Sequence, residues 1–391
     1  MQTDFDVIVA GGGVSGLVTA REIAASGLNV IILEEDHEIG IPEKCGGLIS
    51  IKALTDLGLY PSRKIVENEI KRAIIYSPFG SKVEFETKRQ RIIVLNRRKF
   101  DRELARIAER YGTLLNLGER VLSIKTEDEI IKVTSTKYEK SAKILVDARG
   151  KSSLKHSRQN GFLQAAQYDV YGSWFEKDRV ELYLDNRITP EFFTWVIPLS
   201  NDIARLGVAG KGINPSRYLD DFIKDRKATV IKKIVSPIFV GGALPNFIHD
   251  KVIFVGDAAG QTKPTTGGGI FTGGIGGLFA GRAISKSLLL NEPSALGEYE
   301  LEWKKMFGKE FTVMSKARKI FRELDNKKIE RIFKAMASSN IIDRLVDEAD
   351  FDYHSIGIHL TLTIIKENPS LALDLIKLGT EAIFNLIKSI K

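Results

Sequence analysis

The first hydrophobic run of the chain, Phe5–Ala10, is interrupted only at Asp6 and is followed by three glycines. A nearly unbroken apolar run is typical of a parallel strand buried on both faces. Residues 14–26 have the hydrophobic spacing of a helix, which Gly27 ends. A second apolar run over residues 29–33 predicts the next strand. The chain therefore begins with a strand–helix–strand unit.

The hydrophobic pattern changes further along the chain. Residues 101–111 predict a helix, because Leu104, Ile107 and Ala108 recur on one face. Between residues 160 and 245, apolar and polar positions alternate as in strands with one buried face. The segments there are 164–174, 179–184, 192–198 and 203–209, which are read as an antiparallel sheet. Residues 121–136, earlier in the chain, also alternate and are read as a meander.

The end of the chain is charged and mostly helical. This character begins near Ser294 and continues to two short amphipathic helices, expected at residues 371–378 and 380–391. Together the patterns predict a mixed α/β (α+β) fold with a Rossmann-like βαβ domain, an interleaved antiparallel-sheet substrate domain and a helical C-terminal region. The expected ranges are 1–160 with 246–290 for the first, including a small lobe near 50–100, then 161–245 and 291–391.

The glycines after the first strand indicate nucleotide binding. Gly11, Gly13 and Gly16 fill the pattern G-x-G-x-x-G, in which they allow a tight turn, a close backbone approach to a pyrophosphate and close helix packing. The amides of Val14 and Ser15 then face the phosphates from the helix N-terminus. These residues alone do not separate NAD from FAD.

The second strand ends in an acidic residue, as nucleotide-binding βαβ units do. Glu34 stands where a carboxylate accepts hydrogen bonds from ribose hydroxyls, and this disfavours the 2′-phosphate of NADP. Glu35 is the weaker candidate, since it would face the opposite side of a continued strand.

A distant segment favours FAD. Residues 251–255 predict another apolar strand, which Gly256 and Asp257 follow. This arrangement resembles the second FAD fingerprint of glutathione-reductase-like flavoproteins, where the Asp binds the ribityl chain. By the same resemblance, the amides of residues 267–270 (Gly267, Gly268, Gly269 and Ile270) would face the flavin pyrimidine edge at a helix N-terminus.

Two further segments resemble the hydroxylase branch of these flavoproteins. Residues 144–153 are similar to its A-D-G-x-x-S motif, with Arg149 where an Asp is usual. Arg97 matches the Arg that precedes Phe-Asp in that branch and contacts the cofactor.

Three motifs resemble the geranylgeranyl reductase family over residues 1–310. They are P-x-x-C-G-G at 42–47, a variant of Y-x-W-x-F-P at 193–198 and P-x-x-G-G-G-I at 264–270. The resemblance implies a para-hydroxybenzoate hydroxylase-like fold and FAD-dependent saturation of isoprenoid double bonds in lipids. It also implies that Cys45, Gly46 and Gly47 lie at the cofactor. Phe193, Trp195, Ile197 and Pro198 then line an apolar substrate cavity.

Cys45 lies in the first of these motifs and is the expected catalytic residue, as a redox partner or a proton relay. The alternative is a packing role, because a lone cysteine is usually a small apolar residue. As the single cysteine it also excludes an internal disulfide, which suits a reducing interior.

Charge and composition bear on the partners. The net charge of +8 suits an anionic membrane surface or a phosphorylated substrate, and no basic patch interleaved with aromatic residues indicates nucleic acid. No signal peptide is recognised, so we expect a cytoplasmic protein in peripheral contact with the inner face of the membrane. The five histidines lack metal-ligand spacing, and no metal is expected.

Several alternatives stay open at this point. The fold also suits a flavin-dependent monooxygenase of an aromatic or quinone precursor, or an electron-transfer flavoprotein that reduces a quinone. Within the reductase reading, the substrate is a diether phospholipid, geranylgeranyl diphosphate or a prenylated quinone. The external electron donor is NAD(P)H or a protein reductant such as ferredoxin.

Overall fold

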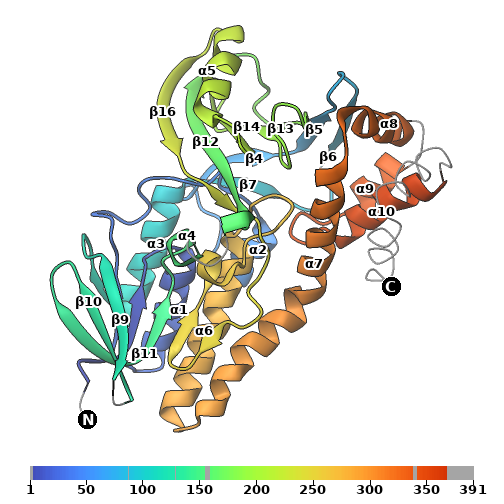
Figure 1. The fold of residues 1–391 in the computed structure, drawn as a ribbon. Coiled ribbons are helices and arrows are strands. Elements are labelled where there is room, and N and C mark those ends of the chain that lie inside the picture. Colours follow the sequence, from blue (N-terminus) through green and yellow to red (C-terminus); the bar gives the residue numbers. More distant parts are fainter. Residues whose placement is uncertain (1–2, 87, 128, 155–158, 338–340, 368–391) are drawn as a thin grey trace.

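The computed structural model describes residues 3–86, 88–127, 129–154, 159–337 and 341–367 (Figure 1). The two amphipathic helices expected at 371–378 and 380–391 lie outside these residues. The predicted mixed α/β fold class is confirmed, since three sheets combine with helices in one unit.

The first sheet has a parallel centre in the order β19-β11-β1-β2-β8, to which β18, β10 and β9 add antiparallel neighbours. Its central strand β1 is wholly buried from Val7 to Ala10, as its apolar run predicts. The strands are β1 (Phe5–Ala10), β2 (Val30–Leu33), β8 (Leu114–Asn116), β9 (Val121–Glu127), β10 (Ile130–Ser135), β11 (Glu139–Asp147), β18 (Ile248–His249) and β19 (Val252–Phe254).

Two helices from distant parts of the chain pack closely beside this sheet. They are α1 (Val14–Ala25) and α6 (Ile270–Leu289), which lie side by side in Figure 1. A Cβ atom added at Gly277 of α6 would lie only 2.4 Å from the Ser15 carbonyl oxygen of α1. Glycine spacing in α6 therefore allows backbone-to-backbone contact that brings the two nucleotide-binding segments together.

The second sheet is antiparallel except for the pair β13/β5, and runs β16-β12-β15-β14-β13-β5-β6 with β17 on β12. The small lobe expected near residues 50–100 includes residues 72–86, but β5 and β6 pair into this sheet. Pairing with β13 is a long-range contact, and strand propensity carries no information on its partner. The strands are β5 (Arg72–Tyr76), β6 (Lys82–Glu86), β12 (Phe162–Tyr171), β13 (Arg179–Tyr183), β14 (Thr194–Pro198), β15 (Ile203–Gly210), β16 (Thr229–Val235) and β17 (Ile238–Phe239).

A third, three-stranded sheet connects the other two in the order β3-β7-β4. These strands are β3 (Leu48–Ser50), β4 (Val66–Ile70) and β7 (Ile92–Leu95), and β7 is buried throughout. Because β3 follows directly on residues 42–47, this sheet holds the predicted cysteine loop against the core.

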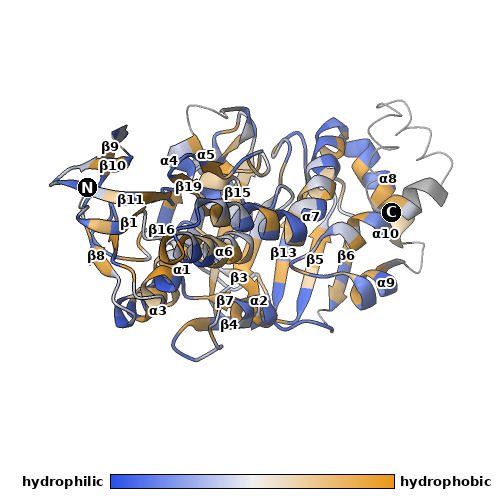
Figure 2. Ribbon diagram, turned by 90° about the horizontal axis from the view of Figure 1, so that it is seen from below, coloured by the Kyte–Doolittle hydropathy of each residue, from blue (hydrophilic) through white to orange (hydrophobic). Residues whose placement is uncertain are grey.

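The remaining helices cover the sheets and build the C-terminal region. Helix α3 begins at Arg97, four residues before the predicted start, because the side chain of Asn96 caps it by accepting from the amide of Lys99. Figure 2 shows hydrophilic and hydrophobic residues alternating along the outer helices α3 and α9. The helices are α2 (Ile51–Asp56), α3 (Arg97–Arg110), α4 (Lys151–Leu154), α5 (Pro215–Asp225), α7 (Gly297–Glu323), α8 (Asn326–Ala337), α9 (Ile341–Glu348) and α10 (Ser355–Glu367), with short 3₁₀ turns η1 (Gln159–Gly161), η2 (Gly256–Ala259) and η3 (Pro293–Leu296).

Candidate active site

A cavity of about 1190 Å³ is lined by residues from all three sheets and from the C-terminal region. It takes in the first glycine turn, the cysteine loop, the segment after β19 and the apolar strand β14. Of the residues predicted for the site, Gly16, Gly256 and Pro198 do not line it. The predicted residues that line it are Gly11, Gly13, Val14, Ser15, Glu34, Glu35, Cys45, Gly46, Gly47, Arg97, Phe193, Trp195, Ile197, Asp257, Gly267, Gly268, Gly269 and Ile270.

The glycine turn after β1 fits a pyrophosphate. Gly11 has φ 110°, and a Cβ atom there would lie 2.5 Å from the carbonyl oxygen of Ala148. A Cβ atom at Gly13 would meet no protein atom within 4 Å, so this position opens onto the cavity. A Cβ atom at Gly16 would lie 2.1 Å from the Gly11 carbonyl oxygen, which gives Gly16 a packing role behind the cavity wall.

Two helix N-termini border the same cavity. Neither α1 nor α6 has a side-chain cap, since both are preceded by glycines, Gly13 and Gly269. The first-turn amides of a helix have no intrahelical acceptor and carry partial positive charge. The cavity therefore meets two sets of amide donors, one suited to phosphate and one to an electron-rich ring edge.

Glu34 is held in the orientation that a ribose-binding carboxylate needs. Its two carboxylate oxygens accept from the amides of Gly12 and Asp36, and burial raises the pKa of this carboxyl group. Glu35 is exposed and forms an ion pair with Arg120 at 3.3 Å. Both residues line the cavity, but Glu34 is the one fixed to the glycine turn.

Asp257 reaches the cavity from the turn η2. Its Oδ1 accepts from the hydroxyl of Thr262 at 2.7 Å, and a Cβ atom at Gly269 would lie 3.0 Å from the same oxygen. Gly256 has φ 64° and lies behind the wall, where an added Cβ atom would be 2.3 Å from Ser15 Oγ. Asp257 thus sits between the two helix N-termini, where it suits a polyhydroxyl chain.

Arg97 lies at the first turn of α3 and faces the cavity. Its guanidinium pairs with Asp101 at 2.8 Å and lies beside the Cys45 thiol. Burial alone would lower the pKa of Arg97, but Asp101 and Cys45 raise it above its ordinary value. Arg97 therefore stays a cation next to the cysteine.

The cysteine loop is anchored to the second sheet by a buried arginine. Arg205 of β15, 1% exposed, donates to the carbonyl oxygens of Cys45 at 3.4 Å and Gly46 at 3.3 Å. Asp169 pairs with Arg205 at 2.9 Å and compensates its charge. These contacts fix the backbone of the loop, and a Cβ atom at Gly46 would lie 2.8 Å from Ile197 Cδ1, so the loop lies against the apolar strand β14.

The apolar part of the cavity is formed by one face of the second sheet. Phe193, Trp195 and Ile197 line it because they are two residues apart along β14 and its approach. Pro198 follows in the opposite phase and does not line the cavity, and its carbonyl oxygen accepts from Asn68 at 2.8 Å. Expecting Pro198 in the cavity overlooked this alternation.

The cavity also takes in residues that sequence reasoning missed. Helix α9 and the loop after it supply Leu345, Val346 and Phe351, and the loop after η2 supplies Lys263. The spacing of α9 predicts an amphipathic helix without saying which surface it covers. Lys263 did carry a signal, because it is the one charged residue between Asp257 and Arg282.

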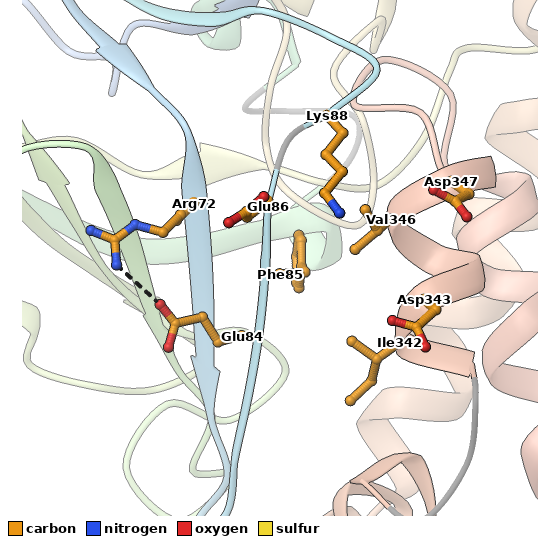
Figure 3. Close-up of a pocket in the computed structure, with 9 residues that line it drawn as sticks. All are labelled: Arg72, Glu84, Phe85, Glu86, Lys88, Ile342, Asp343, Val346 and Asp347. Atoms are coloured by element: carbon orange, nitrogen blue, oxygen red, sulfur yellow. Dashed lines mark ion pairs between the residues drawn. The ribbon is translucent and has the colours of Figure 1, made fainter.

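A smaller pocket of about 540 Å³ adjoins the cavity where β6 faces α9. Figure 3 shows Phe85 projecting from β6 and Ile342 and Val346 projecting from α9 toward each other. The two spaces share Phe85, Glu86, Lys88 and Val346 in their linings. The smaller pocket between β6 and α9 therefore lies next to the apolar chamber and shares part of its wall.

Comparison with known proteins agrees with this geometry. Residues 6–158 match the family model described as FAD dependent oxidoreductase. Digeranylgeranylglycerophospholipid reductase 2 of Methanopyrus kandleri is 30% identical over 94% of this chain and 98% of its own length. An uncharacterized protein of Methanocaldococcus jannaschii is 32% identical over 90% of this chain and 93% of its own length.

A solved structure shares the fold. It is a geranylgeranyl bacteriochlorophyll reductase-like protein from Thermoplasma acidophilum, with a TM-score of 0.82 and 24% identity over 96% of this chain and 99% of that one. Fold, site and family model define an FAD-dependent oxidoreductase. The chain belongs to the geranylgeranyl reductase family, to which the digeranylgeranylglycerophospholipid reductases belong. The predicted family and the predicted cofactor, FAD, are both confirmed.

Proposed function

We propose that this protein uses reduced FAD to saturate the isoprenoid double bonds of a geranylgeranyl lipid. The observation that carries the proposal is the continuity of one cavity, which joins a nucleotide-binding glycine turn to an apolar chamber. Relatives at about 30% identity named digeranylgeranylglycerophospholipid reductase support the substrate class.

We propose that FAD binds in this cavity. The turn at Gly11 and Gly13 and the start of α1 would hold the pyrophosphate, and Glu34 would accept from the ribose. Asp257 would bind the ribityl chain, and the start of α6 at Gly269 would meet the flavin ring. When bound, FAD supplies the hydride that adds to one alkene carbon.

The apolar chamber binds and orients the prenyl chain in the absence of water. Burial of a chain contributes about 0.8 kcal/mol per methylene-sized unit, so binding needs few polar contacts. Trp195 on β14 and Phe193 just before it belong to one apolar cluster with Phe351 of the C-terminal loop. These rings would hold the alkene against the flavin side of the cavity.

Cys45 is the group that we propose to hold a proton for the second alkene carbon. Its Sγ lies in the loop clamped by Arg205, next to the Arg97 guanidinium and on the cavity wall. Saturation of one double bond then consumes one hydride and one proton.

The direct test uses the purified holoenzyme under anaerobic conditions. The enzyme is reduced with dithionite and mixed with a digeranylgeranyl diether phospholipid, geranylgeranyl diphosphate or a prenylated quinone. Mass spectrometry should find two added hydrogens for each saturated bond in at least one of them. If all three return unchanged while the bound FAD stays reduced, the reductase proposal fails.

A parallel reaction separates the monooxygenase alternative. Reduced enzyme that consumes O₂ in proportion to an oxygenated product would replace the reductase proposal with oxygenation. Quinone reduction without saturation of any isoprenoid would instead favour electron transfer.

We also propose that the electrons come from NAD(P)H or a ferredoxin-like protein, and that the protein contacts the inner face of the membrane peripherally. Among the described residues, no helix is long and apolar enough to cross a bilayer. The net charge of +8 supports contact with anionic lipid. Flotation with anionic liposomes should recover the full chain and lose it when residues 371–391 are deleted; a chain that never floats contradicts the contact.

A further inference from the structure

A buried lysine, Lys263, lies in the loop between η2 and α6, where this loop meets the apolar chamber. Lys263 is 6% exposed and lines the cavity. A Cβ atom added at Gly268 would lie 3.2 Å from its Cε and 3.9 Å from its Nζ. The backbone of Lys263 also donates to the Gly268 carbonyl oxygen at 2.9 Å and accepts from the Gly267 amide at 2.9 Å. Its side chain is therefore packed against the glycine run that precedes α6.

The C-terminal loop holds the other side of the ammonium group. Lys263 Nζ donates to the Phe351 carbonyl oxygen at 3.1 Å and lies 5.1 Å from the centre of the Phe351 ring. Asp352 Oδ1 is 4.0 Å from Nζ, while Asp352 Oδ2 accepts from the hydroxyl of Ser50. Ser50 of β3 thus holds the Asp352 carboxylate, and the Lys263 ammonium group lies against Gly268.

The nearby histidine adds no positive charge. His354 Nδ1 is hydrogen-bonded to Thr265 Oγ1 at 2.7 Å and its Nε2 to the Phe351 carbonyl oxygen at 3.1 Å. Burial and the neighbouring Lys263 lower the pKa of His354 to about 3, so its ring is neutral. Among Lys263, Asp352 and His354, Lys263 is the charged side chain that lies against Gly268.

Burying an ammonium group is costly unless it is paired or serves a charged ligand. One carboxylate at 4.0 Å and one carbonyl oxygen leave donor capacity on Nζ. Burial also lowers the pKa of Lys263, because it destabilises the charged ammonium group. A negative charge in the cavity would offset this destabilisation.

We propose that Lys263 supplies the positive charge that stabilises FAD after it has taken up two electrons and one proton. FAD then carries one added negative charge, and Lys263 keeps its own proton. The cation would add to the partial charge of the α6 N-terminus and make the bound FAD easier to reduce. The inference rests on FAD binding in this cavity, as proposed above, and not on the identity of the lipid.

The test measures the two-electron reduction potential of bound FAD, with dithionite as the reductant and no lipid present. We expect Lys263→Met to lower the equilibrium constant for reduction at least tenfold, which corresponds to about 30 mV. Lys263→Arg keeps the charge and should stay closer to the parent protein. Lys88→Met is the matched control, because Lys88 lines the same cavity but is exposed, and it should leave the potential unchanged.

A potential that is unchanged in Lys263→Met, or that falls as far in Lys263→Arg, overturns the inference. Asp352→Asn provides a measurement that does not require the lysine variants to fold. Removal of a carboxylate should raise the potential, whereas a fall would mean that packing of the cluster, and not charge, sets it. None of these measurements uses an isoprenoid, so they can fail while lipid saturation is still observed, and the reverse also holds.

Discussion

At the scale of single residues, three glycines of one motif have three different physical roles. Side chains at Gly11 and Gly16 would collide with backbone, whereas a side chain at Gly13 would enter only the cavity. Gly13 also has ordinary extended dihedrals, φ −75° and ψ 177°, which any residue adopts. A substitution there therefore separates cofactor binding from folding.

We predict that Gly13→Val leaves the apoprotein folded but weakens FAD binding at least tenfold, or by about 1.4 kcal/mol. The added methyl groups would occupy the space of the pyrophosphate. Fluorescence titration of FAD against the apoprotein gives the affinity, and circular dichroism verifies the fold. Gly297→Ala is the control, since an added Cβ atom there also meets nothing within 4 Å and the site is remote. Unchanged FAD affinity in Gly13→Val would mean that the pyrophosphate lies elsewhere.

A second prediction at this scale concerns Cys45. Cys45→Ser should slow lipid saturation about 100-fold, the usual contribution of a positioned proton donor, with the FAD content unchanged. Single-turnover oxidation of reduced enzyme by lipid is the measurement. If Cys45→Ser and Cys45→Ala both turn over at the parent rate, the cysteine has only a packing role.

At the scale of elements, the contact between α1 and α6 decides whether the two halves of the cofactor site meet. Cβ atoms at Gly273, Gly277 and Gly281 would all lie within 3 Å of atoms of α1. The spacing of four residues between these glycines predicts a helix face that permits close approach, but not the helix that occupies it. The identity of α1 as the partner is a long-range contact that only the fold supplies.

We predict that Gly277→Leu destabilises the protein by about 1–3 kcal/mol, because the side chain forces the backbones of α1 and α6 apart. Chemical denaturation of the apoprotein measures this change. Gly308→Ala in α7 is the matched control: its Cβ atom would lie 3.8 Å from Lys304 Cβ, and alanine should stabilise the helix by about 0.5–1 kcal/mol. Equal stabilities for the two variants would contradict the proposed role of the close contact between α1 and α6.

At the scale of the whole molecule, the apolar chamber is completed by parts of the chain that are far apart. The strand β14 contributes one wall, and α9 with the loop after it contributes another, about 150 residues later. The chamber adjoins the smaller pocket where Val346 of α9 faces Phe85 of β6 (Figure 3). The length of the prenyl chain that the chamber accepts should therefore depend on the side chains of α9.

We predict that Val346→Trp raises the KM for a geranylgeranyl substrate about tenfold, or by about 1.4 kcal/mol, because the larger side chain would fill part of the chamber that Val346 lines. Reduction of bound FAD by dithionite should not change, because the nucleotide end is remote from α9. Arg344→Trp serves as the control, since Arg344 does not line the cavity and pairs with Glu348 at 3.0 Å. An unchanged KM in Val346→Trp would mean that the prenyl chain does not occupy the part of the chamber beside α9.

The sequence by itself determined the βαβ unit, and the resemblance of two distant segments to flavoprotein fingerprints indicated the cofactor. The βαβ unit depends on local order: strand periodicity, glycine spacing, and an acid after the second strand. Such local features do not depend on how distant parts of the chain fold. Tertiary structure alone decided that β5 and β6 join the second sheet, that α9 closes the chamber and that Lys263 meets Asp352. Such contacts join residues tens to hundreds of positions apart, and neither propensity nor periodicity specifies which distant surface a segment covers.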